Sequence, residues 1–130
     1  MSTPPDPNEQ ALDKFGQFMV AKLRDRAIEK YLLTQDGYWL SPGLQSLQKR
    51  LGKLSSDQRQ LVLEVVVDVL DTALHDVLFA FQEAHDCEDG IAVIVDGVNV
   101  AAVSDGLQGE PYSDEGWLAR FSRYPELGRH

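Results

Sequence analysis

The sequence has 130 residues, of which 43% are hydrophobic and 25% are charged, and these values are ordinary for one globular domain. Twelve basic residues against 21 acidic ones give a net charge of −9. Because phosphate binding requires clustered Lys and Arg, this balance argues against a nucleic-acid-binding role.

The sequence also indicates where the protein acts. Residues 1–9 contain no basic segment followed by an apolar one, and acidic residues interrupt the longest apolar runs. We therefore expect neither a secretory signal nor a membrane span. Cys87 is the single cysteine and cannot form an internal disulfide, which favours a cytoplasmic protein.

The first predicted helix covers about residues 7–34. Asp6 is a suitable N-cap, Pro7 fits the first helical position, and Gly37 is a natural stop. A disordered tail is expected over residues 1–5. An aromatic connector, residues 38–40, follows the first helix. The same combination of cap and proline at Ser41-Pro42 then opens a second, short helix, and Gly52 ends it.

A third helix is predicted over about residues 56–86, with Ser55 and Gln58 as a capping box. Most positions from Leu61 to Phe81 are apolar, so we expect neighbouring elements to cover most of its circumference and the helix to form the centre of the core. Such a helix is about 45 Å long, against a diameter of about 36 Å for a compact domain of this size. It must therefore break between residues 72 and 86, project, or extend into a partner.

The segment after the long helix predicts a β-hairpin near residues 91–103. Asp96-Gly97 separates two β-branched runs, 91–95 and 98–104, and Asp-Gly between such runs is a strong hairpin signal. A two-residue turn places Val95 opposite Val98, Val93 opposite Val100 and Ile91 opposite Ala102. We expect the apolar face of this hairpin to pack on the helices.

A polar loop and a short last helix complete the predicted fold. Ser113 is the expected cap of the helix, Trp117 lies on its inner side and Pro125 stops it. The predicted architecture is α+β, with three main helices, the hairpin and the C-terminal helix in a single domain over residues 6–125. Residues 126–130 are expected to form a loose tail.

Two groups of polar residues are candidate sites. The first is an acidic stripe on the long helix, formed by Glu64, Asp68, Asp71 and His75. These residues share one helical face and are weak candidates for a metal site, but a solvated face is the expectation. The second is the loop near residues 104–117, where binding residues commonly concentrate; its candidate partner-binding residues are Asp105, Glu110, Tyr112, Asp114 and Trp117.

In size, acidity and small α+β plan, the sequence resembles small bacterial domains that include immunity-type inhibitors of toxins. The leading functional prediction is a non-enzymatic protein-interaction or inhibitor module that binds a basic protein partner and uses no cofactor. One alternative is a small metal-dependent or hydrolytic enzyme that uses His75 with Asp68 and Asp71, or His85 with Asp86. The other is a structural homodimer formed through the overlong helix or the hairpin edge.

Overall fold

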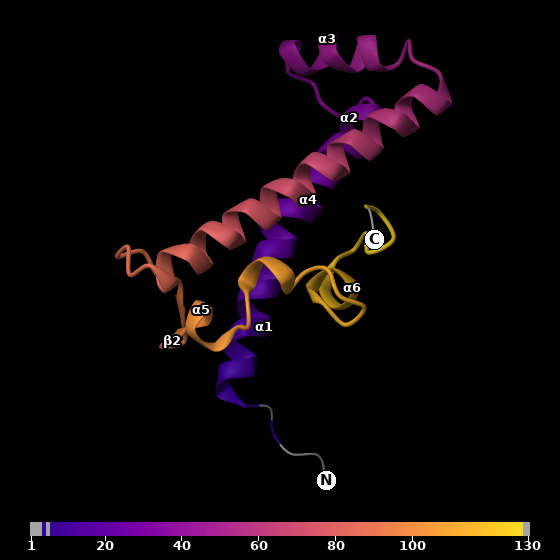
Figure 1. Cartoon of the computed structure of the whole chain (residues 1–130). Coiled ribbons are helices and arrows are strands. Elements are labelled where there is room, and N and C mark those ends of the chain that lie inside the picture. Colours follow the sequence, from indigo (N-terminus) through magenta and orange to yellow (C-terminus); the bar gives the residue numbers. More distant parts are fainter. Residues whose placement is uncertain (1–3, 5, 129–130) are drawn as a thin grey trace.

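Helices dominate the part of the chain that the computed structural model describes, which is Pro4 and residues 6–128 (Figure 1). Residues 1–3 and 5 of the expected N-terminal tail, and residues 129–130 of the expected C-terminal tail, lie outside this part. The α+β prediction is confirmed. In chain order the elements are α1 (Pro7–Met19), η1 (Val20–Asp25), α2 (Arg26–Gln35), α3 (Pro42–Leu51), α4 (Ser56–Asp86), β1 (Ile94–Val95), β2 (Val98–Asn99), α5 (Val100–Val103), η2 (Leu107–Gly109) and α6 (Trp117–Phe121).

The first predicted helix is confirmed as a continuous run of α1, η1 and α2. The Asp6 carboxylate caps it by accepting a 3.0 Å hydrogen bond from the backbone N–H of Asn8, and the chain turns at Gly37, which has a φ of 76°. The sequence does not predict that η1 is a π-helical turn. This turn lies where Arg24 and Asp25 are both buried.

The long helix α4 is also confirmed, together with its capping box. The backbone N–H of Ser55 donates to Oε1 of Gln58 at 2.8 Å, and the N–H of Gln58 donates to Oγ of Ser55 at 3.1 Å. The helix runs for 31 residues without a break, so the break considered between residues 72 and 86 does not occur. At about 46 Å, it instead projects from the rest of the molecule (Figure 1). We call the projecting end, residues 36–70, the arm.

The expected coverage of α4 on most sides is wrong. The helix buries one stripe, whose members are Val67, Asp71, Leu74, Leu78 and Gln82. On the other side Leu61, Val65 and Val69 are 60%, 54% and 59% exposed. The reason is that the neighbours of α4, which include α2, η1, α5 and η2, pack along this one stripe. None of the helices in the described residues is long and apolar enough to cross a membrane.

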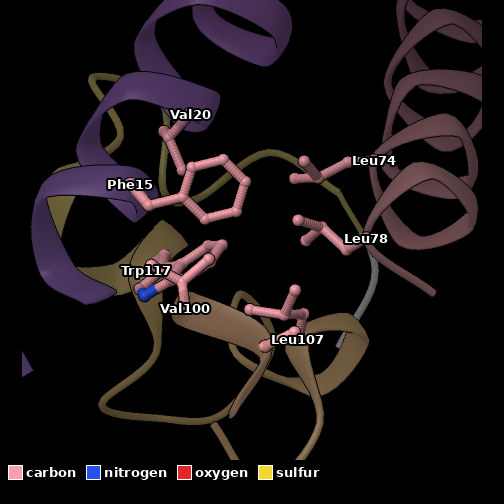
Figure 2. Packing of buried hydrophobic residues seen from close by; sticks show 8 residues of the cluster. Phe15, Val20, Leu74, Leu78, Val100, Leu107 and Trp117 are labelled. Atoms are coloured by element: carbon pink, nitrogen blue, oxygen red, sulfur yellow. The ribbon is translucent and has the colours of Figure 1, made fainter. Parts of the chain in front are cut away.

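The core lies where the first helix, the C-terminal half of α4 and the C-terminal segments meet (Figure 2). The Phe15 ring stands edge-on to the Trp117 ring, with centroids 5.9 Å apart. This arrangement is favourable for aromatic pairs. The buried cluster consists of Phe15, Val20, Leu74, Leu78, Val100, Ala101, Leu107 and Trp117.

The hairpin is confirmed at its turn and is shorter than predicted. Val95 pairs with Val98 as expected, but residues 100–103 form the short helix α5 rather than a strand. The predicted pairing of Ile91 with Ala102 is therefore wrong. Tertiary packing explains the difference: Val100 and Ala101 are buried, and the Gln82 side chain donates a 3.1 Å hydrogen bond to the Ala101 carbonyl.

The last helix, α6, begins later than the predicted cap implies. Its N-cap is Gly116 and not Ser113. A side chain at position 116 would meet the Glu110 carbonyl oxygen at 2.6 Å, so only glycine fits this close crossing of two backbones. The prediction that Trp117 points inward is confirmed, because its side chain is fully buried.

Tyr31 connects α2 to the arm, and its titration is expected to lower the stability of the fold at alkaline pH. Its hydroxyl donates to the Arg59 carbonyl at 3.0 Å, and burial raises the Tyr31 pKa above its ordinary value of 10.0. Below pH 10 the Tyr31 hydroxyl is protonated in both the folded and the unfolded protein, so the raised pKa costs no stability there. Above pH 10 the unfolded chain loses this proton more readily than the folded protein, so the free energy of unfolding falls as the pH rises. Urea titrations on either side of pH 10 should therefore show a larger alkaline loss of stability for the wild type than for Tyr31→Phe. Equal losses would contradict this role.

Candidate functional site

Asp71 does not belong to an open acidic stripe, because it forms a buried ion pair. Its Oδ1 accepts a 2.6 Å hydrogen bond from Nε of Arg24, and the two residues are 5% and 0% exposed. The expected solvated face is therefore wrong at Asp71, while Glu64, Asp68 and His75 are exposed as expected. The pair joins η1 to the middle of α4.

The same arginine holds the C-terminal segment. Its guanidinium also donates to Oγ of Ser122 at 3.0 Å and to the Tyr124 carbonyl at 3.1 Å, and it bonds to the Leu127 carbonyl. Asp25 accepts a further bond from the Ser122 hydroxyl at 2.7 Å. Leu127, which lies in the expected loose tail, is thus bonded directly to this buried polar cluster.

A small cavity lies beside this pair. It has a volume of about 230 Å³ and is lined by Asp68, Asp71, Thr72, His75 and Tyr112. The cavity brings together the residues of the alternative enzyme hypothesis, but Asp71 is bound to Arg24, and Nδ1 of His75 lies 3.1 Å from the Asp76 carboxylate. Within the described residues, no group of three or more His, Cys, Asp or Glu side chains is placed to hold a metal ion.

Three of the predicted partner-binding residues, Glu110, Tyr112 and Trp117, also make contacts within the protein. Trp117 is fully buried, and the Tyr112 hydroxyl donates to the Asp71 carbonyl at 2.6 Å. Glu110 accepts a 2.7 Å hydrogen bond from the Ser104 hydroxyl. Asp105 and Asp114 are the members of this set that are exposed.

Glu110 and Asp114 lie together in an acidic groove that the sequence does not predict. The groove has a volume of about 610 Å³, and Glu9, Asp13 and Glu115 also line it. Arg120 crosses it and donates to both carboxylate oxygens of Asp13, at 3.2 and 3.0 Å; this hydrogen bonding raises the Arg120 pKa. Glu9 and Asp13 come from α1, about one hundred residues away in sequence, and no local pattern links them to the loop.

The clearest surface feature is an apolar stripe on α4. Leu61, Val65 and Val69 follow one another at intervals of four residues, so they lie on one side of the helix. Phe79, which is 45% exposed, extends this side towards the C-terminal end. We call these four residues the α4 face. The sequence contains a signal for this face, because most positions from Leu61 to Phe81 are apolar. When neighbouring elements cover only one side of such a helix, apolar side chains on another side stay exposed.

The arm carries further exposed apolar side chains outside α4. α3 contains no buried residue. Tyr38, Leu40 and Leu47 are exposed, and Leu40 is 83% exposed. Exposed apolar side chains that gather into a patch mark interaction sites in folded proteins.

Comparisons of the chain with family models, curated proteins and solved structures found no match.

Proposed function

We propose that this protein is a non-enzymatic protein-interaction module whose binding surface is the α4 face. The observation that carries the proposal is the exposure of Leu61, Val65 and Val69 by more than half on a helix that projects from the core. Fully burying such a side chain contributes about 1.5–3 kcal/mol. A partner that covers the exposed halves of these three would gain a few kcal/mol.

Charge supports a partner with a basic surface. The chain has a net charge of −9, and exposed acidic residues lie beside the α4 face, at Glu64 and Asp68, and within it, at Asp76. Complementary charge steers encounter and suppresses wrong partners. We further propose that the protein acts in the cytoplasm, since Cys87 is an exposed free thiol.

The arrangement of the candidate catalytic residues supports a role without catalysis. A general acid or base must reach the substrate with a free titratable group. The Asp71 carboxylate is held by Arg24, and the His75 ring stacks on Phe79 with an interplanar angle of 4°. These side chains serve packing and ion pairing.

Site-specific photo-crosslinking in cells that express the protein natively tests the binding face. A photoreactive phenylalanine analogue at Val65 or Val69 should give covalent adducts of one discrete mass. The same analogue at Gln17, an exposed position on α1, is the control and should give none. Adducts from Gln17 alone, or from no position, would overturn the proposal.

A further inference from the structure

The tip of the arm, residues 41–55, and the far end of α4 carry opposite charges. Lys49 and Arg50 end α3, Lys53 lies in the turn that follows, and all three are exposed. Between Arg59 and Arg120 the sequence contains no Lys or Arg. The end of α4 and the turn after it carry the exposed acidic residues Glu83, Asp86, Glu88 and Asp89. The start of α4 thus adjoins a basic tip, and its other end, about 46 Å away along the helix, is acidic.

We propose that the occupant of the α4 face is a second copy of this chain, packed antiparallel on the same face. The inference rests on the proposed binding face and names its partner. In a two-fold dimer the same patch of each copy contacts the other. An antiparallel arrangement brings the basic tip of each arm to the acidic end of the other α4, so the apolar stripes and the opposite charges are satisfied together.

One register pairs three residues of the α4 face with apolar side chains and also meets the charge requirement. When Val65 faces Val69 of the second copy, counting along the two antiparallel helices places Leu61 opposite Ala73 and Phe79 opposite Ser55. Asp76, the acidic residue within the stripe, then faces the polar Gln58 rather than an apolar side chain. The last turns of α4, with Glu83 and Asp86, extend past the start of the other α4 and reach the turn that carries Lys53.

The size of this contact predicts a weak dimer. The overlap of the two helices is about 35 Å long and 10–12 Å wide, and with the charged ends it buries about 1,000 Å² in total. That area is near the lower bound for a specific interface. We therefore expect a micromolar, reversible dimer that weakens as salt screens the exposed charges.

Sedimentation velocity of the full chain over a range of concentrations tests the dimer. The mass should rise from 14.5 kDa towards twice that value at high micromolar concentration. Val69→Glu should remain monomeric over the whole range, because each dimer would then bury two carboxylates. Gln60→Glu places the same charge on another side of α4 and should still dimerise. Circular dichroism melting verifies that both variants are folded.

A charge-swap cycle tests the orientation. Lys53→Glu and Glu83→Lys should each weaken the dimer by about fivefold or more, and the double variant should recover most of the loss. Single swaps without effect, or no recovery, would overturn the antiparallel arrangement. A wild type that is monomeric at every concentration would overturn the homodimer; the photo-crosslinks from Val65 and Val69 would then decide separately whether a different protein occupies the face.

Discussion

Asp71→Asn is expected to lower the free energy of unfolding by about 3–5 kcal/mol, because it leaves the buried Arg24 guanidinium without its carboxylate. The arginine is fully buried and holds Ser122 and Tyr124 as well as Asp71. The loss should therefore extend to the C-terminal segment. Urea denaturation measures the free energy, and amide hydrogen exchange should show faster exchange over residues 122–127.

Asp68→Asn is the matched control for this prediction. Asp68 lies one turn before Asp71 on the same helix and is exposed, so the same change should alter stability by less than about 0.5 kcal/mol. If the two variants were equally stable, the buried Arg24–Asp71 ion pair would not stabilise the fold as proposed.

Gly16→Ala should destabilise the fold by about 1–3 kcal/mol, because the added methyl overpacks the core. Its Cβ would lie 2.5 Å from Cε2 and 2.6 Å from Nε1 of Trp117. The indole is fully buried and stands against Phe15, so it has little room to move. The sign is informative, since Gly→Ala inside an exposed helix normally stabilises by up to about 1 kcal/mol.

Gly43→Ala provides the comparison for Gly16→Ala. Gly43 is also helical, in α3, and a Cβ there meets nothing within 4 Å. It should be neutral or slightly stabilising. Thermal melts of the two variants should therefore shift in opposite directions or differ by several degrees, and a Gly16→Ala protein as stable as the wild type would contradict the close packing of Trp117.

Signals within a few residues of one another predicted the starts of α1 and α4 and the hairpin turn correctly. Asp6-Pro7, the Ser55–Gln58 capping box and Asp96-Gly97 each satisfy their own backbone groups locally. Such contacts depend little on the rest of the fold. The sequence is therefore sufficient to place them.

Features that depend on distant partners could not be predicted. Asp71 lies at the edge of the acidic stripe, next to the buried Val67 and Leu74, and nothing near it in sequence identifies Arg24 as its partner. Val100 belongs to a β-branched run, but packing against the core places it in a helix. Trp117 of the candidate loop fills the core, while the described elements leave the α4 face exposed.

The Arg24 cluster also bears on the order in which parts of the chain fold. It joins residues as far as 103 positions apart, from Arg24 to Leu127, whereas α2 contacts α3 and α4, which lie nearer to it in sequence. Contacts between distant residues form slowly because a long loop must close first. The local contacts of α2, α3 and the start of α4 can therefore form before residues 122–127 reach Arg24.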